Sequence, residues 1–194
     1  SRNREDLLRA TGSRYCPAAP GGDLQKLESM PGPCIVVGKP CDIEAVVRAG
    51  QNHPSLRDRI FLTISIFCAG TPTLEGTLKL LARMGIAEEE VRSFRYRGCG
   101  WPGMMTALRR DGKQGRSVPY EQAWGEILSR HGQLRCRLCP DSTGQFADIA
   151  CGDPWYKASD GRDPGRSLVL ARTRKGEQIL KRARRAGYVS VCPR

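Results

Sequence analysis

Histidine is scarce in this chain, since the 194 residues include only His53 and His131. Both lie in polar, turn-like surroundings, so we do not expect a Ser–His or Cys–His catalytic arrangement. A long apolar run is also missing. The longest one, residues 60–69, is interrupted by Thr63 and Ser65 and falls short of the roughly 20 residues that a membrane helix needs. We therefore expect no membrane span.

Secretion signals and the usual nucleotide-binding motifs are absent as well. The N-terminal residues are charged and no apolar segment follows them, unlike a signal peptide. The chain has no initiator methionine, which is expected of a processed or partial product. It contains neither a P-loop nor a GxGxxG motif, so a nucleotide-binding Rossmann enzyme is not expected.

Cysteine, by contrast, is abundant, with nine residues in the chain. An odd number of cysteines cannot pair completely, and a chain without a secretion signal seldom builds a disulfide scaffold. We therefore expect a cytoplasmic protein whose cysteines hold metal.

The charge is strongly positive, with 32 Lys and Arg against 20 Asp and Glu and a net charge of +12. Such an excess favours an anionic partner, namely nucleic acid, a phosphate-bearing cofactor or an acidic redox protein, or it forms a solvated basic surface. Residues 177–186 predict a helix with a basic face. No aromatic side chains are interleaved there, as single-stranded nucleic-acid binding would favour.

The hydrophobic pattern predicts a loop-rich lead-in over residues 1–33, followed by an α/β domain over residues 34–194. Buried strands alternate with helices in this domain, which predicts a mixed sheet flanked by helices, with a cofactor site at the carboxyl ends of the strands. The expected strands are 34–38, 59–67, 92–97, 168–171 and 188–191, and the expected helices are 42–50, 74–84, 120–128 and 177–186.

Two cysteines occupy equivalent positions in this pattern. Cys41 and Cys68 each follow a predicted strand and precede a helix, at the sheet edge where ligands bind in open α/β folds. A CxxC pair followed by proline, Cys136 and Cys139, adds two more sulfurs. The combination favours a metal cluster over four separate structural cysteines, and a structural zinc site is the alternative.

Two further stretches are rich in residues that line sites. Residues 97–103 combine an arginine with glycines and Trp101, which indicates either a ligand-binding loop or a hairpin turn with a packed tryptophan. Residues 135–155 are dense in Asp, Gly and Trp, so we expect a site-lining loop rather than a regular element. Trp124 belongs to an apolar helical stripe and is expected in the core.

Six motifs, read in order, resemble the beta subunit family of coenzyme F-420 hydrogenases and dehydrogenases, which includes the 7-hydroxymethyl chlorophyll a reductases. The resemblance covers roughly residues 10–190. The motifs occupy residues 38–45, 67–72, 94–103, 136–141, 147–155 and 165–167.

The resemblance implies an iron–sulfur flavoprotein oxidoreductase that passes electrons between a 4Fe–4S cluster and FAD, and on to a two-electron carrier such as coenzyme F-420. Hydrogenase or dehydrogenase subunits, or another redox protein, would be its partners. It further implies that Cys41, Cys68, Cys136 and Cys139 hold the cluster. The residues implied for the flavin are Gly38, Lys39, Ala69, Gly70, Thr71, Arg97, Gly98, Gly100, Trp101, Asp148, Gly152, Asp153, Trp155, Arg166 and Ser167.

Individual roles follow from the side-chain chemistry. Lys39 is the candidate catalytic residue, because a positive charge beside the flavin or cluster would favour the reduced states; the alternative is an exposed loop lysine. Arg97 would bind the flavin pyrophosphate, and Trp101 or Trp155 would wall the ring. The candidates for polar contacts to the flavin are Asp148, Asp153 and Arg166.

The chain departs from the family pattern in two ways. Family members are usually longer, so this sequence corresponds to a central portion of them, and Cys99 stands where asparagine is expected. A competing interpretation is a zinc-stabilised basic module that binds nucleic-acid phosphates. Structural zinc sites usually use local ligand pairs, whereas Cys41 and Cys68 stand alone and far apart, which makes a nucleic-acid partner the weaker prediction.

Overall fold

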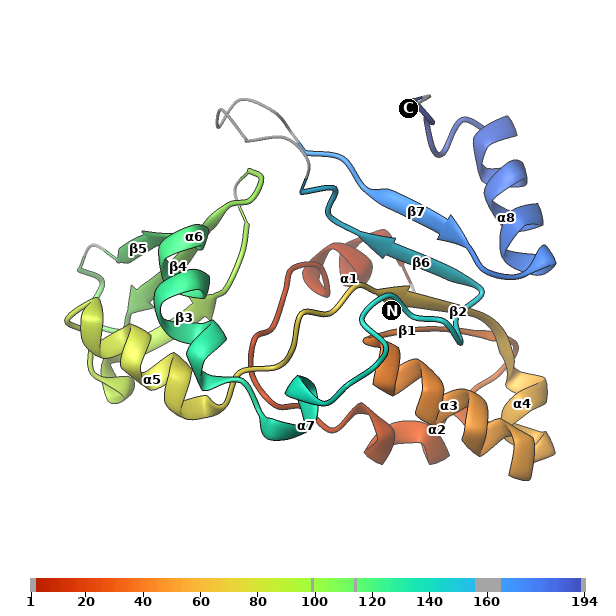
Figure 1. Cartoon of the computed structure of the whole chain (residues 1–194), viewed down its shortest axis with the longest axis horizontal. Coiled ribbons are helices and arrows are strands. Elements are labelled where there is room, and N and C mark those ends of the chain that lie inside the picture. The colour runs from red at the N-terminus through yellow and green to blue at the C-terminus, as the bar shows by residue number, and fades with distance from the viewer. Residues whose placement is uncertain (1–2, 99, 114, 156–164, 193–194) are drawn as a thin grey trace. The chain divides into compact units, whose positions relative to one another are not determined.

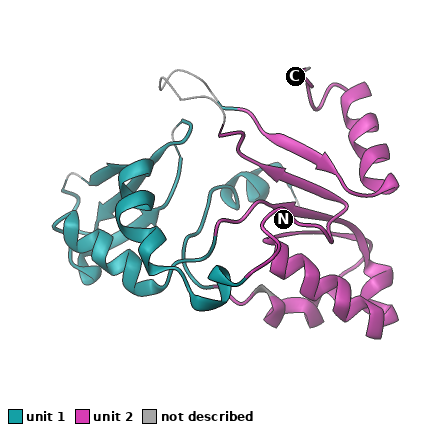
Figure 2. Ribbon diagram, viewed as in Figure 1, with its two compact units in different colours: residues 1–17, 70–138, 156–165 teal, residues 18–69, 139–155, 166–194 magenta. Residues whose placement is uncertain are grey.

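The computed structural model describes residues 3–98, 100–113, 115–155 and 165–192. The chain forms two compact units, shown in teal and magenta in Figure 2. Unit 1 comprises residues 1–17, 70–138 and 156–165, and unit 2 comprises residues 18–69, 139–155 and 166–194. The division does not follow the boundary predicted at residue 33, because residues 1–17 belong with unit 1. Each unit is described by itself below.

Unit 2 is built on a mixed four-stranded sheet with the order β1-β2-β6-β7. The first three strands are parallel, and β7 runs antiparallel to β6 (Figure 1). This confirms the predicted mixed sheet. The strands are β1 (Cys34–Gly38), β2 (Ile60–Ile66), β6 (Ile149–Gly152) and β7 (Leu168–Ala171).

The helix α3 (Pro40–Asn52) connects β1 to β2 and packs on both strands through its apolar stripe, including the buried Ile43 and Val46. A proline at the first helical position suits this start, because that position needs no N–H donor. Other helices of unit 2 are η1 (Pro20–Asp23), α2 (Leu24–Glu28), α4 (Pro54–Arg59) and α8 (Arg174–Arg185), which lies beside β7 (Figure 1).

Two predictions for unit 2 were wrong. Residues 149–152, expected within a loop, form β6, because Ile149 and Ala150 are buried in the sheet as an apolar strand start. Residues 188–191, expected as a final strand, form no ladder with the described strands, and Tyr188 is 85% exposed. These residues alternate like a strand but pair with no described strand, which shows that local propensity alone does not make a strand.

Unit 1 contains a three-stranded antiparallel sheet with the order β3-β4-β5. Its first strand and the helix before it were predicted, whereas β4 and β5 were not. The strands are β3 (Val91–Arg95), β4 (Met104–Arg109) and β5 (Arg116–Pro119). The helical segments are α1 (Arg4–Arg9), α5 (Leu74–Arg83), η2 (Glu88–Glu90), α6 (Tyr120–Gln122), η3 (Ala123–Ile127), η4 (Leu128–His131) and α7 (Leu134–Arg137).

The core of unit 1 lies between α5, the sheet and the continuous helical run from α6 to η4. Met105 and Ala107 of β4 are fully buried in it, with Leu80 and Leu128 from the helices. Trp124 packs against this core, with its ring centroid 4.8 Å from that of Tyr15. The prediction that Trp124 is a core residue is therefore confirmed.

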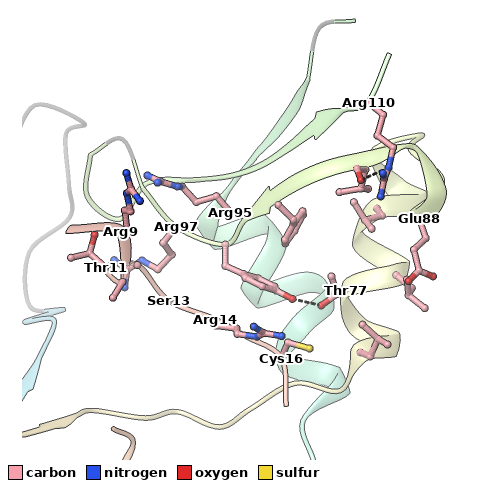
Figure 3. Close-up of a pocket in the computed structure, with 18 of the residues that line it drawn as sticks. Arg9, Thr11, Ser13, Arg14, Cys16, Thr77, Glu88, Arg95, Arg97 and Arg110 are labelled. Carbon is pink, nitrogen blue, oxygen red and sulfur yellow. Dashed lines mark hydrogen bonds between the residues drawn. The ribbon is translucent and has the colours of Figure 1, made fainter. Parts of the chain in front are cut away.

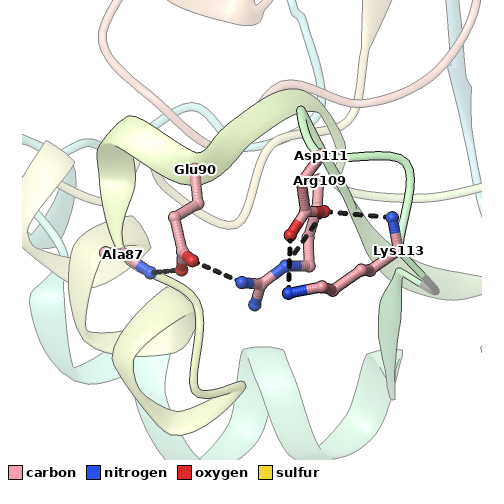
Figure 4. Close-up of polar contacts among 5 residues, drawn as sticks. All are labelled: Ala87, Glu90, Arg109, Asp111 and Lys113. Atoms are coloured by element: carbon pink, nitrogen blue, oxygen red, sulfur yellow. Dashed lines mark hydrogen bonds and ion pairs between the residues drawn. The ribbon is translucent and has the colours of Figure 1, made fainter.

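A charged network joins the start of β3 to the end of β4 in unit 1 (Figure 4). The Glu90 carboxylate accepts a hydrogen bond from the Arg109 guanidinium and another, 2.9 Å long, from the Ala87 backbone N–H. On the other side, Asp111 accepts from the Lys113 backbone N–H at 3.0 Å. This bond, with the nearby Arg109 and Lys113 charges, lowers the pKa of Asp111.

Candidate functional site

Cys41 and Cys68 lie at matching places on the sheet of unit 2. Gly38 of β1 pairs with Ser65 of β2, and each cysteine comes three residues after its paired position. Because the two strands are parallel, both cysteines emerge at the carboxyl edge of the sheet, as the sequence predicted. Cys41 lies in the first turn of α3, where backbone N–H groups favour anionic side chains.

Cys139 belongs to a loop that is fastened to the same edge. The Ser142 carbonyl accepts a hydrogen bond of 3.0 Å from the Cys68 backbone N–H. Within the loop, the Cys139 thiol donates to the Asp141 carbonyl at 3.3 Å. Cys68 and Cys139 therefore stand on neighbouring loops of unit 2, and Cys41 stands in the first turn of α3 at the same edge of the sheet.

The buried Asp141 carboxylate organises this loop. It accepts hydrogen bonds from the backbone N–H groups of Thr143 (3.0 Å), Gly144 (2.7 Å) and Gln145 (3.0 Å). Gly144 has a φ of +73°, and a Cβ there would lie 2.3 Å from the Ser65 Cβ. The loop can therefore approach β2 closely only with glycine at position 144.

Cys136, the remaining predicted ligand, lies in unit 1. Its sulfur accepts a hydrogen bond of 3.4 Å from the Thr71 backbone N–H. Gly70, with a φ of +117°, would place a Cβ 3.5 Å from the Cys136 Cβ, and Gln133 donates to the Thr71 carbonyl. Gly70 and Thr71, which the sequence assigned to cofactor binding, thus make the surroundings of this sulfur.

The donor chemistry of these loops fits an iron–sulfur cluster: thiols at strand ends, with backbone N–H groups that can donate to sulfur. The described cysteines are free thiols. Across the described ranges, however, no three His, Cys, Asp or Glu side chains are gathered around a common metal position. The four-cysteine ligand set therefore stays a prediction, and Cys99 lies outside the described residues.

Cys151, on β6, differs from the predicted ligands. Burial raises the pKa of its thiol, which keeps it protonated at neutral pH. It lies in the sheet beside Ile66 rather than on a loop. Its surroundings suit a packing cysteine.

Lys39 lies at the N-cap of α3, where it is paired with Asp42. Its ammonium is 2.8 Å from the Asp42 carboxylate, which also accepts from the Lys39 backbone N–H at 3.0 Å. Asp42 occupies the third helical position and caps the helix by accepting this backbone hydrogen bond. The Lys39 charge, which was predicted to favour the reduced states of the cofactors, is therefore balanced by the Asp42 carboxylate.

Two predicted cofactor glycines have packing roles in unit 2. A Cβ on Gly38 would lie 2.9 Å from the Asp42 Cβ, and one on Gly152 would lie 2.3 Å from the Phe67 ring. Either contact is closer than real Cβ atoms allow. These glycines are explained by the folding of the strand ends, with no need of a ligand.

Asp148 lies at the opposite end of β6 from Gly152 and Asp153. Its carboxylate accepts from the Thr63 backbone N–H (3.1 Å) and the Thr173 hydroxyl (2.7 Å) and is 3.0 Å from the Lys175 ammonium. Burial would raise the pKa of Asp148, but the bonds from Thr173, Thr63 and Lys175 outweigh it and lower the pKa. The structure thus gives Asp148 a role in joining β2, β6 and α8.

The other predicted residues of unit 2 cluster at the carboxyl edge. Asp153 and Trp155 follow β6, and Arg166 and Ser167 precede β7, whose first residue pairs with Gly152. Trp155 is 54% exposed, and its backbone N–H donates to the Asp153 carbonyl. Ala69 directly follows Cys68, so these residues and the three cysteines share one edge.

The glycine-rich loop of unit 1 connects β3 to β4. The Arg97 Nε donates to the Pro102 carbonyl at 2.9 Å, and its guanidinium carbon lies 5.0 Å from the centre of the Tyr120 ring. Gly98 has a φ of +152°, and a Cβ there would meet the Arg95 side chain at 2.7 Å. The loop therefore holds Arg97 and leaves room for the Arg95 side chain, whereas Gly100 has open space around it.

Gly165 and Trp101 lie against each other in unit 1. A Cβ on Gly165, whose φ is +83°, would lie 2.8 Å from the Trp101 Cβ. Trp101 is half-buried, so part of its side chain is packed within unit 1 and part stays exposed. The hairpin-turn and ligand-loop interpretations of residues 97–103 are therefore compatible.

Unit 1 also contains a cavity of about 1050 Å³ between the segment after α1, α5 and β3 (Figure 3). Arg95 and Arg97 line it, together with Arg9, Thr11 and Arg14 from the N-terminal segment. Sequence reasoning missed the N-terminal residues, because nothing in their local pattern links them to a strand that lies about 80 positions later.

The comparisons with known proteins identify the family. Residues 33–194 match the family described as the C terminus of the coenzyme F420 hydrogenase/dehydrogenase beta subunit. The match covers most of the chain, so the protein belongs to this family, as the six motifs indicated.

Two curated relatives are similar over almost the whole chain. An uncharacterized protein of Methanocaldococcus jannaschii is 30% identical over 97% of this chain and 50% of its own length. The F420-dependent formate dehydrogenase 1 subunit beta of Methanococcus maripaludis is 27% identical over 96% of this chain and 46% of its own length. The chain thus spans about half the length of these relatives.

A solved structure shares the fold. A chain of the F420-reducing [NiFe] hydrogenase complex from Methanosarcina barkeri aligns with a TM-score of 0.65 and 24% identity, over 96% of this chain and 61% of that one. Within the part of the chain described, no helix combines the length and apolar character needed to cross a bilayer.

Proposed function

We propose that this protein is an iron–sulfur flavoprotein oxidoreductase module. In this proposal it carries a 4Fe–4S cluster and FAD and passes electrons between them and a two-electron carrier such as coenzyme F420. The family membership supports a redox role, since the M. maripaludis relative is named an F420-dependent formate dehydrogenase subunit.

One observation carries the proposal: the convergence of cysteine-bearing loops at the carboxyl edge of the unit 2 sheet. Cys41 and Cys68 follow paired positions on adjacent parallel strands, and the Cys68 N–H is bonded to the loop that begins at Cys139. Cys136, the fourth ligand that the sequence predicts, receives a hydrogen bond from the Thr71 N–H. Such placement of thiols at strand ends serves a ligand better than it serves packing.

When bound, a cluster exchanges single electrons and a flavin exchanges electrons singly or as a hydride. The chain's own residues would set the conditions. Cys41 lies in the first turn of α3, and the Thr71 N–H donates a hydrogen bond to the Cys136 sulfur, so both sulfurs would be near backbone donors of the kind that tune a bound cluster. The Lys39–Asp42 pair brings little net charge to this edge, so we propose that Lys39 orients the start of α3.

For the flavin, the structure supports a shorter set of contacts than the sequence did. Asp153, Trp155 and Arg166 lie at the cysteine-bearing edge. Arg97, held by Pro102, is proposed for the pyrophosphate, with Trp101 beside it. Gly38, Gly152 and Asp148 are explained by packing and hydrogen bonding within unit 2, so we propose structural roles for them.

The partners are proposed on the same grounds. Hydrogenase or dehydrogenase subunits, or another redox protein, would exchange electrons with the cluster, and coenzyme F420 or a related small molecule would exchange them with the flavin. The net charge of +12 suits acidic partners of either kind. A cytoplasmic location remains a prediction.

A set of cysteine variants tests the proposal. Cys41→Ala, Cys68→Ala, Cys136→Ala and Cys139→Ala are each expected to lose most of the iron and sulfide of anaerobically purified protein. Cys192→Ala is the control, because Cys192 is an exposed thiol outside the site. Far-UV circular dichroism confirms that each variant is folded. Unchanged iron in two or more of the four variants would contradict the ligand set.

A further inference from the structure

One face of the unit 2 sheet is exposed along β1. Cys34 is buried and Val36 is half-buried, whereas Ile35 and Val37 are 56% and 59% exposed. The helix α3 packs on β1 and β2, and Figure 1 shows it together with α4 on one side of these strands. Because successive side chains of a strand point to opposite faces, Ile35 and Val37 lie on the face away from α3.

Strand pairing extends this exposed face across the sheet, since side chains at paired positions point to the same side. Val37 pairs with Ile64 of β2. Two residues along that strand, Ile66 pairs with Cys151 of β6, which in turn pairs with Val169 of β7. Ile66 is 47% exposed and Val169 is 40% exposed. We call this surface the open face, and it consists of Ile35, Val37, Ile64, Ile66, Cys151 and Val169.

An exposed apolar face is unusual for strands that run parallel. Parallel strands occur almost only in sheets whose two faces are both covered by helices. Apolar side chains that lie next to one another on a protein surface mark an interaction site. Within the described residues, the open face is therefore a surface that a further helix would complete.

The basic helix α8 borders the open face. A Cβ on Gly176, in the first turn of α8, would lie 3.2 Å from the Ile149 Cγ1. Ile149 pairs with Ile64, so its side chain points to the same side of the sheet as the open face. Ile149 is only 4% exposed. The start of α8 therefore covers one end of this side of the sheet and leaves the open face uncovered.

Positive charge is concentrated on α8 and the residues before it. Residues 172–185 contain seven Lys and Arg against one Glu, a net charge of +6, which is half that of the whole chain. The single acid, Glu177, is paired with Lys181, and Lys175 is paired with Asp148. In the part of the chain described, no carboxylate lies within ion-pair distance of the four exposed arginines of α8, Arg174, Arg182, Arg184 and Arg185. Such a group of cations attracts a surface that carries carboxylates.

We propose that the open face is the docking site for an acidic amphipathic helix of a partner protein. The apolar stripe of that helix covers Ile35, Val37 and Ile66, and its carboxylates pair with the arginines of α8. The open face contains no aromatic side chain, whereas proteins that bind single-stranded nucleic acid or lie on membranes typically use them. A helix with both an apolar stripe and carboxylates matches both halves of the surface.

A synthetic peptide tests the apolar half of the site by fluorescence anisotropy. The labelled peptide has about 20 residues, with leucines along one helical face and glutamates on the others. We expect Val37→Asp to weaken its binding at least tenfold, because a charge would be buried in the contact. Leu108→Asp is the matched control, since it places the same charge at a 48% exposed position on a strand of unit 1. Val37→Thr keeps the side-chain shape and should weaken binding several-fold, so the test stands even if Val37→Asp does not fold.

The charged half is tested with the same peptide at low ionic strength. The double variant Arg182→Gln/Arg185→Gln should weaken binding about tenfold, and this difference should disappear in concentrated salt. Arg92→Gln/Arg116→Gln removes the same charge from exposed positions of unit 1 and should leave the affinity unchanged.

Several results would overturn the proposal. They are undetectable peptide binding, equal binding of a peptide with the same composition in scrambled order, and binding that Val37→Asp does not change. A dimer in sedimentation that Val37→Asp dissociates would show that a second copy covers the open face. Binding of duplex DNA or anionic vesicles that depends on Val37 would show a different class of partner. None of these results depends on iron or flavin, so the proposed function is judged separately.

Discussion

Asp148 offers the sharpest test of how unit 2 is held together. We expect Asp148→Asn to lower the free energy of unfolding of unit 2 by about 3 kcal/mol at pH 7, since hydrogen bonds to a charged group contribute about 1.5–3 kcal/mol each and are not additive. The substitution removes the charge that faces Lys175. It also replaces one of the two carboxylate oxygens, Oδ2 that accepts from Thr63 or Oδ1 that accepts from Thr173, with an amide group that cannot accept. The volume of the side chain is unchanged, so no cavity contributes.

The pH dependence has a defined sign. The pKa of Asp148 is lower in the folded protein than in the unfolded chain, so its contribution is fully present above the unfolded value, near about 3.9. It is lost as the pH falls through the lower, folded value. The difference between Asp148→Asn and the unmodified protein should therefore be constant from neutral pH to about pH 5 and shrink in more acidic solution.

Urea unfolding followed by hydrogen exchange on peptides from β2 and β6 measures this free energy within unit 2. Asp58→Asn is the control, because Asp58 forms an exposed ion pair with Arg57 and should contribute less than about 1 kcal/mol. Equal, small losses in both variants would refute the reasoning. If Asp148→Asn loses flavin but keeps its stability, Asp148 contacts the cofactor, as the sequence predicted.

Three other substitutions, two of them with a comparison variant, test contacts within the units by the same exchange method. Gly144→Ala should destabilise unit 2 by about 3 kcal/mol, because the added Cβ clashes with Ser65. Gly85 has a similar φ but open space around it, so Gly85→Ala should destabilise unit 1 by only about 1 kcal/mol. Equal losses of stability in the two variants would contradict the clash. Gly125→Ala, in a helical segment with no heavy atom near the added Cβ, should stabilise unit 1 by about 0.5–1 kcal/mol, and a loss would show that the site is crowded. Glu90→Gln should destabilise unit 1 by about 1 kcal/mol, because it removes the ion pair with Arg109. Lys79→Gln, which removes an exposed ion pair, should leave the stability nearly unchanged. Equal stabilities of the two variants would show that the charged network does not stabilise unit 1.

Strong local patterns made most of the parallel part of the fold predictable. The β-branched run at residues 34–38 and the apolar run at 59–67 became β1 and β2 within a residue at each end. The helix expected over residues 74–84 is α5, and Gly85, with a φ of +68°, follows its C-cap. Because strand ends are set by the same patterns, the shared edge of Cys41 and Cys68 was predictable too.

Features that depend on distant partners were not predictable. β4 and β5 are short and carry arginines, so only their antiparallel pairing with β3 identifies them as strands. Asp148 resembled a site residue until its bonds to Thr63 and Thr173 placed it between β2 and α8. Arg9 and Arg14 could not be linked to β3 from the sequence, because only the folded chain brings them to the same cavity.

Metal and flavin analysis of the anaerobically purified protein tests the central claim most directly. We predict about four iron and four sulfide per chain, one FAD and no stoichiometric zinc, with a brown colour that dithionite bleaches. Zinc in place of iron, with no flavin, would contradict the redox function and favour the zinc-stabilised, nucleic-acid-binding alternative.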